Sequence, residues 1–110
     1  MIASNPDIPY YAVIFTSVKS SHSEGYSEMA EAMHKLAAQQ SGFLGVESAR
    51  EEVGITVSYW KDLESIKQWK LNSQHLLAQK KGREQWYSQY KTRICRVERE
   101  YSFEQYLTYT

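Results

Sequence analysis

The stretch ITVSYWKDLESIKQWKLNSQH, residues 55–75, decides the fold because a strand pattern passes directly into a helix pattern within it. Its first six residues alternate between two faces, as the side chains of a β-strand do. One face would carry Ile55, Val57 and Tyr59, and the other Thr56, Ser58 and Trp60. The pattern therefore predicts a strand that presents Trp60 to one side of a sheet and Tyr59 to the opposite side.

The second part of the same stretch predicts an interrupted helix. Asp62 belongs to the residue types that cap helix N-termini well, and Ile66 and Trp69 follow at helical spacing. Residues 71–74, Leu-Asn-Ser-Gln, predict a break, after which a further helical segment continues. In an unbroken helix, the side chains of Trp69 and His75 would point about 120° apart. A break would let both face one cavity.

The rest of the chain completes a β-α-β-β-α-β order. Strand composition marks residues 10–18 and 42–50, and apolar steps of three and four mark a helix from residue 26 to 37. The turn at 51–54 is short enough for an antiparallel hairpin. Helical steps continue through Trp86, Tyr87 and Tyr90, and residues 92–103 predict the last strand. We expect one α+β domain over residues 1–110, ferredoxin-like with an antiparallel sheet, whose core spans about 10–103.

The first strand is apolar on both faces, which predicts a homodimer. One face would carry Tyr11, Val13 and Phe15, and the other Ala12, Ile14 and Val18. A sheet with helices on one side only normally shows polar residues on its other side. A second subunit, packed sheet against sheet, is the simplest cover for the remaining face.

Composition limits the kinds of partner and the cellular compartment that we expect for the protein. Lys and Arg number 13, Asp and Glu also number 13, and no basic block exceeds two residues, which argues against a nucleic-acid or membrane-surface partner. No apolar run approaches the ~20 residues of a membrane span. The N-terminus lacks the pattern of a signal peptide, and the single Cys95 is expected to be a small buried side chain. These features predict a cytoplasmic protein.

Few residues stand out as candidates for chemistry. Metal motifs are missing, and the histidines lie far apart at positions 22, 34 and 75, so we expect no metal site. His75, just after the predicted break, is either a helix-capping residue or a proton donor or acceptor in a cavity. Trp60 and Trp69 would be core residues or the aromatic wall of that cavity. Other candidates for ligand contacts are Asn72, Arg50, Tyr59 and Trp86.

Three segments resemble the antibiotic biosynthesis monooxygenase family: GFLGVESAR at 42–50, residues 55–75, and RVEREYSF at 96–103. The shared pattern is Gly-Phe-Leu-Gly opening the second strand, Tyr-Trp ending the third, a Trp in the next helix, and a His six residues later. The resemblance covers roughly residues 10–103. It implies a dimeric α+β barrel with a cavity in each subunit between sheet and helices. Some members oxygenate aromatic polyketides without metal or flavin, and others bind and open haem.

The residue-level resemblance is partial. Trp69 matches the helix Trp that lines the cavity in both active branches. The polyketide-oxidising branch would place an Asn at Ser65 and a Tyr near His75. The haem-opening branch would need an Asn in the first strand, which is missing, and a His at Gln79. The resemblance therefore disfavours haem breakdown.

Together these features predict a monooxygenase-like enzyme that needs no cofactor and acts on a small hydrophobic or aromatic metabolite. Trp60 and Trp69 would form the aromatic wall, His75 would transfer the proton, and Asn72 or Arg50 would donate a hydrogen bond to the developing oxyanion. A non-catalytic module that binds such a metabolite is the alternative from another class. A third possibility is a plain dimer whose core is filled.

Overall fold

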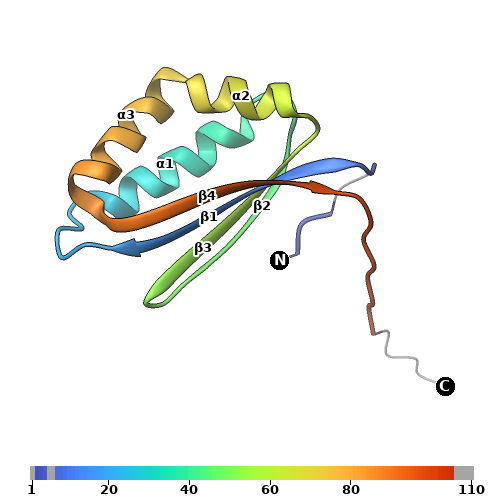
Figure 1. The fold of residues 1–110 in the computed structure, drawn as a ribbon, viewed down its shortest axis with the longest axis horizontal. Coiled ribbons are helices and arrows are strands. Elements are labelled where there is room, and N and C mark those ends of the chain that lie inside the picture. Colours follow the sequence, from blue (N-terminus) through green and yellow to red (C-terminus); the bar gives the residue numbers. More distant parts are fainter. Residues whose placement is uncertain (1, 5–6, 106–110) are drawn as a thin grey trace.

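The protein forms a four-stranded antiparallel sheet with helices on one face, in a computed structural model that describes residues 2–4 and 7–105 (Figure 1). Strand order in the sheet is β2-β3-β1-β4. In chain order the elements are β1 (Tyr10–Lys19), α1 (Tyr26–Ala38), β2 (Phe43–Arg50), β3 (Val53–Trp60), α2 (Leu63–Leu71), α3 (Ser73–Lys81), the π-helical turn η1 (Gly82–Trp86) and β4 (Tyr87–Val97). This confirms the predicted α+β, ferredoxin-like fold.

Strand register assigns each side chain to one face of the sheet. Tyr11 lies opposite Trp60 and Val13 opposite Ser58, so these residues share the face that the helices cover. Trp60 is fully buried there, in a core cluster with Ala37 of α1 and Ile66 of α2. The alternation predicted for residues 55–60 is therefore confirmed, and the Trp60 side is the helical side.

The helix-free face carries the other half of β1 and β3. It is covered near Tyr10, whose hydroxyl donates to the carboxylate of Glu100 over 2.6 Å. It is open at its other end, where 48 % of Val53 and 45 % of Ile55 is exposed. The two-sided apolar pattern of β1 is thus present in the structure, while the helices cover only one of its sides.

Two sequence-based expectations were wrong. The last strand begins at Tyr87 and ends at Val97, not at 92 and 103, and the helical steps predicted through Tyr87 and Tyr90 belong to this strand. Pairing with β1, which places Tyr90 opposite Ser17, overrides the local spacing. Cys95 is exposed rather than buried, because β4 places it opposite Ala12 on the helix-free face.

Candidate functional site

Three aromatic rings, Trp60, Trp69 and His75, form a continuous stack between the sheet and the helices. The ring centroids of Trp60 and Trp69 lie 6.0 Å apart with 26° between the planes. Those of Trp69 and His75 lie 4.1 Å apart with 15° between the planes. Phe43 packs edge-on against Trp60, and Trp60 Nε1 donates to Ser58 Oγ over 2.9 Å. We refer to Trp60, Trp69 and His75 as the ring stack.

The predicted break between α2 and α3 produces this stack. Asp62 begins α2 as its N-cap and accepts a hydrogen bond from the Ser65 amide over 2.8 Å. Asn72 ends α2 and begins α3, with a non-helical backbone at φ −58° and ψ 129°. The chain therefore changes direction between Trp69 and His75, and the two rings meet face to face.

Asn72 positions His75 through its side-chain oxygen. Asn72 Oδ1 accepts hydrogen bonds from the amides of Gln74, over 3.0 Å, and His75, over 3.3 Å. This is ordinary N-capping, which satisfies amides at the start of α3. The oxygen is thus engaged as an acceptor, and the Nδ2 amide group of Asn72 could donate a hydrogen bond to a ligand.

The hydrogen bonding of His75 defines which of its nitrogens is basic. Its Nδ1 lies 2.9 Å from the Trp69 carbonyl oxygen. Since a carbonyl oxygen only accepts, the neutral ring carries its proton on Nδ1, and Nε2 holds the lone pair. Burial lowers the pKa of His75, and the hydrogen bond to Trp69 opposes that effect in part. The ring is therefore neutral at pH 7 and can accept a proton at Nε2.

Two open hollows lie away from the ring stack. One, of about 600 Å³, is bounded by the start of α1, by α3 and by η1, with Met29, Leu77 and Trp86 among its lining residues. The other, of about 300 Å³, lies beside Asp62 and Ser65. Neither is lined by a member of the ring stack, and Trp60 occupies the space between Trp69 and the sheet.

The structure separates the remaining candidates from the ring stack. Tyr59 lies on the helix-free face, where its hydroxyl donates to Glu47 over 2.5 Å. Burial, and to a smaller extent this hydrogen bond, raises the pKa of Tyr59 to about 12. Trp86 is buried beneath the start of α1 and donates from Nε1 to the Glu24 carbonyl over 2.8 Å. Of the seven candidates, the structure thus brings together Trp60, Trp69, Asn72 and His75.

Arg50 lies on the helical side, at the other end of the sheet. It pairs with Gly54, six residues before Trp60 on β3, so about 20 Å of strand separates it from the ring stack. Its Nη2 donates to the hydroxyl of the buried Ser17, and its guanidinium lies 5.7 Å from the ring centroid of Tyr26.

Around Arg50 the structure assembles an aromatic cluster that the sequence did not reveal, formed by Phe15, Tyr26, Tyr87 and Tyr90. Neighbouring ring centroids lie between 5.2 and 5.8 Å apart. Burial and a hydrogen bond with Tyr26 raise the pKa of Tyr87. The density of tyrosines was visible in the sequence, but three distant segments supply the cluster, so only the strand pairing could locate it.

Within the described residues, no three His, Cys, Asp or Glu side chains gather closely enough to bind a metal ion. Over the same part of the chain, no helix combines the length and apolar character needed to cross a membrane.

Comparison with known proteins shows which family the chain matches. The family model described as antibiotic biosynthesis monooxygenase matches residues 9–81. The uncharacterized protein YqjZ of Bacillus subtilis (strain 168) is 49 % identical over 106 residues, covering 94 % of this chain and 93 % of that protein.

Two solved structures share the fold at low sequence identity. SnoaB, a cofactor-independent oxygenase from Streptomyces nogalater, superimposes with a TM-score of 0.68 at 10 % identity, over 88 % of this chain and 99 % of SnoaB. A conserved protein from Methanosarcina mazei Go1 superimposes with a TM-score of 0.70 at 12 % identity, over 84 % of this chain and 95 % of that one.

Proposed function

The chain belongs to the antibiotic biosynthesis monooxygenase family, and from that premise we propose that it is a monooxygenase that needs no cofactor. Its substrate would be a small hydrophobic or aromatic metabolite. The observation that carries the proposal is His75, a neutral ring stacked on Trp69 whose Nε2 holds a free lone pair. The likeness to SnoaB, itself a cofactor-independent oxygenase, supports the same class of reaction.

In the proposed reaction the protein supplies proton transfer and orientation. His75 Nε2 removes a proton from an activated CH₂ group of an electron-rich aromatic substrate. The resulting carbanion passes an electron to dioxygen, and combination of the two radicals gives a peroxide that loses water. The net change, CH₂ + O₂ → C=O + H₂O, is balanced without an external reductant. The edge of Trp69 would contact the flat substrate, and Asn72 Nδ2 would donate to its developing oxyanion.

The direct test is oxygen uptake by the metal-free protein. Chelator-treated protein is mixed with a panel of hydroxylated polycyclic substrates that contain an activated CH₂ group, and dissolved oxygen is followed with an electrode. We expect one O₂ consumed per ketone formed, with one atom of ¹⁸O₂ retained in the product. No uptake above the protein-free rate across the panel would contradict the proposal.

A non-catalytic binding module is the second candidate function. Because Trp60 already fills the space beneath Trp69, the close packing of the ring stack favours a plain dimer with a filled core over a chamber that encloses a ligand, so a binding module would have to use the outer surface of the stack. Such a module would bind a flat aromatic molecule on the accessible side of the stack without consuming oxygen. Saturable binding with unchanged dissolved oxygen would therefore select the module over the enzyme. Absence of both binding and uptake would leave a dimer with a filled core.

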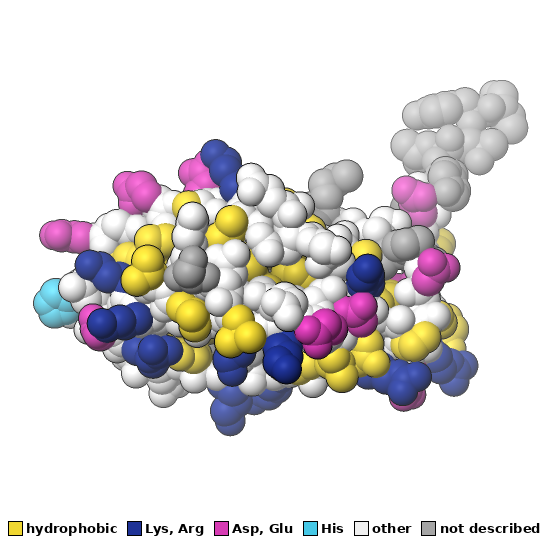
Figure 2. All heavy atoms as spheres, turned by 90° about the horizontal axis from the view of Figure 1, so that it is seen from above, with side chains coloured by type: hydrophobic (Ala, Val, Ile, Leu, Met, Phe, Trp, Pro, Cys, Tyr) yellow, Lys and Arg dark blue, Asp and Glu magenta, His cyan; other side chains and the backbone are white. Residues whose placement is uncertain are grey.

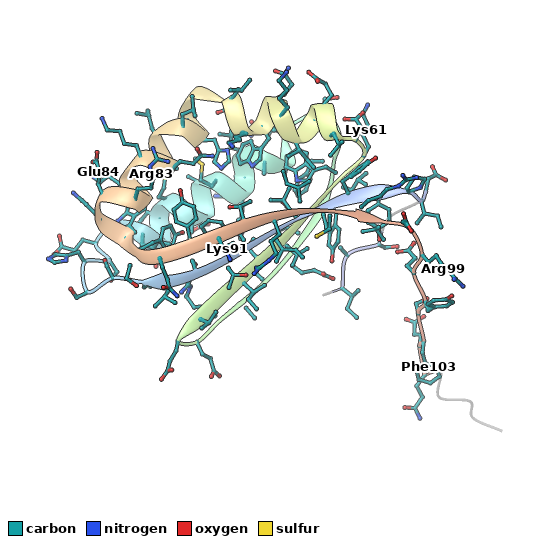
Figure 3. All side chains as sticks on the ribbon, in the orientation of Figure 1. Lys61, Arg83, Glu84, Lys91, Arg99 and Phe103 are labelled. Carbon is teal, nitrogen blue, oxygen red and sulfur yellow. The ribbon has the colours of Figure 1, made fainter. Side chains whose placement is uncertain are left out.

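We further propose that the functional unit is a homodimer in the cytoplasm, joined through the helix-free face. Support comes from the exposed Val53 and Ile55 on that face and from the segment that follows β4, which runs away from the rest of the chain (Figures 1 and 3). Phe103 on this segment is 88 % exposed, an unusual state for so large an apolar side chain. A partner subunit would cover both surfaces, and with them Cys95.

Light scattering should accordingly give twice the mass of one chain at micromolar concentration. Ile55→Arg should shift the mass toward that of the monomer, because it buries a charge without a partner in the interface. Leu77→Arg is the matched control, since Leu77 is 67 % exposed on α3. Figure 2 shows the helical side, on which hydrophobic and charged side chains are interspersed. A monomer mass for the unmodified protein would refute this assembly.

The lowered pKa of His75 predicts how turnover depends on pH. Because burial lowers its pKa below the ordinary 6.5, the neutral, proton-accepting form predominates at pH 7. We expect kcat/KM to be constant at about pH 7–8 and to fall in a one-proton step as the pH drops below 6.5.

The lowered pKa of His75 also makes the folded state more stable at higher pH. The unfolded chain binds the His75 proton more readily, so the stabilising contribution is present above pH 6.5 and is lost as the pH falls through the lowered pKa. NMR titration of the His75 imidazole resonances checks both statements. A His75 titration midpoint above 6.5 would contradict them.

A further inference from the structure

The guanidinium of Arg50 is held in a fixed position on the sheet. It lies against the backbone of Gly54, where a Cβ atom would come within 2.1 Å of its Cζ and Nη2 atoms. Its Nη2 donates to Ser17 Oγ, and Ser17 is itself only 1 % exposed. Any larger residue at position 54 would displace the group. The absence of a side chain on Gly54 therefore creates the space in which this cation rests.

The charge of Arg50 has no counterion within the described residues. Arg50 Nη1 is the one buried side-chain nitrogen or oxygen in that part of the chain without a hydrogen-bond partner. The one ion pair there joins Lys35 to Glu31, on the surface of α1. An arginine stays protonated, and burying its charge without a partner is costly. The position is therefore suited to an anion that the chain itself does not supply.

A second cation and the start of a helix add to the local positive potential. Lys19 Nζ lies 4.3 Å from the ring centroid of Tyr26, the ring that Arg50 also faces. Tyr26 is the first residue of α1, and its N-cap, Gly25, provides no side-chain hydrogen bond. Helix N-termini carry partial positive charge. Arg50, Lys19 and this N-terminus thus converge around one ring.

An aromatic cluster adjoins Arg50 through Tyr26, whose ring centroid lies 5.7 Å from the guanidinium. Phe15 lies 5.4 Å from Tyr87 and 5.2 Å from Tyr90 between centroids, and Tyr26 lies 5.6 Å from Tyr87. Tyr90 is 38 % exposed, so the cluster is reachable from solvent on that side. A flat ring could pack beside these side chains edge-to-face, the arrangement that they adopt among themselves.

We propose that Arg50 and the aromatic cluster form a binding site for a small aromatic carboxylate. The carboxylate would accept a charge-assisted hydrogen bond from Arg50 Nη1, and the ring would lie against Phe15 and Tyr90. Binding here would neutralise the half-buried cation and cover the exposed edge of Tyr90. The site lies about 20 Å of strand away from the ring stack and requires no turnover, so it goes beyond the proposed oxygenase activity.

Calorimetric titration with benzoate at low ionic strength tests the site, with benzyl alcohol as the neutral probe and inorganic phosphate as the ringless anion. We expect one benzoate per chain, bound at least about tenfold more tightly than either comparison probe. Arg50→Gln keeps a donor for Ser17 but removes the charge, and it should weaken benzoate binding by about tenfold or more. Circular dichroism melts establish that the variant is folded.

Gly54→Ala is the second variant, because it retains Arg50 and its charge but fills the space in which the guanidinium rests. It should also weaken benzoate binding, whereas His34→Ala, at an exposed position on α1, should leave it unchanged. The proposal is overturned if benzoate does not saturate the protein, or if Arg50→Gln binds it equally well. Equal affinity for benzyl alcohol or for phosphate would overturn it too. None of these outcomes depends on oxygen uptake. Failure of the carboxylate-site proposal can therefore be told apart from failure of the oxygenase proposal.

Discussion

Replacing Trp60 with alanine is expected to lower the free energy of unfolding by roughly 3–5 kcal/mol, the usual cost of removing a large buried aromatic side chain. Trp60 is fully buried and joins α1, α2 and the sheet in one cluster. Its loss would leave a cavity beneath Trp69 and deprive Phe43 of its edge-on contact. Urea denaturation measures the change, and Leu63→Ala, at a position 54 % exposed, is a control expected within about 0.5 kcal/mol of the unmodified protein.

The same measurement on Trp69→Ala separates a ligand wall from a structural seam. Trp69 is half-buried and stacks on Trp60 with one face and on His75 with the other, so a ligand would contact its edge. If it forms a wall, its replacement should weaken binding of a flat aromatic ligand more than it destabilises the fold. A loss of stability as large as that of Trp60→Ala, with no effect of ligand on the melting of either variant, would show that the ring stack is core alone. A Trp60→Ala protein as stable as the Leu63→Ala control would contradict the packing argument itself.

His75→Ala is expected to reduce kcat/KM for oxygen-dependent turnover by about 10²- to 10⁴-fold, the range contributed by a positioned general base. The fold should survive, because the variant loses one hydrogen bond to the Trp69 carbonyl, worth about 1 kcal/mol. His34→Ala is the matched control, since His34 is exposed on α1, and its turnover should not change. Oxygen uptake measured with a fixed substrate compares the three proteins.

Two outcomes of that comparison would argue against His75 as the base. Full turnover by His75→Ala would assign proton removal to another group or to solvent. A loss of turnover that accompanies a collapse of the melting transition would show only that the ring stack holds the fold together. Asn72→Ala helps to separate these cases. It retains the imidazole but removes the cap of α3 and the Nδ2 donor, so it should cost about 1 kcal/mol of stability and lower turnover without a collapse of the fold.

The stretch that ends in His75 shows how far local patterns reach. Alternation over residues 55–60 predicted that Trp60 and Tyr59 face opposite sides, and helix spacing with Asp62 as the cap predicted α2. The break at Asn72 was also predicted, because Asn and Ser are unfavourable inside a helix and favourable at its N-cap. All of these signals are local, in that neighbours along the chain decide them.

The β4 boundary shows where local patterns fail. Trp86, Tyr87 and Tyr90 have helical spacing, yet the strand begins at Tyr87. Its backbone groups are satisfied by pairing with β1, some seventy residues earlier, and the number of residues in η1 determines where that pairing can start. The exposure of Cys95 has the same origin, because the register with β1 decides which face of the sheet it occupies.

By itself, the sequence determined the order of elements, the two-sided apolar first strand, the helix break and the family to which the chain belongs. Tertiary structure alone decided which face of the sheet the helices cover, and so why Trp60 meets Trp69 and His75 while Tyr59 meets Glu47. It alone placed Arg50 over Gly54, beside Ser17 and Tyr26. The physical reason is that periodicity specifies only the relative orientation of neighbouring side chains, whereas contacts between distant segments depend on strand register and helix packing.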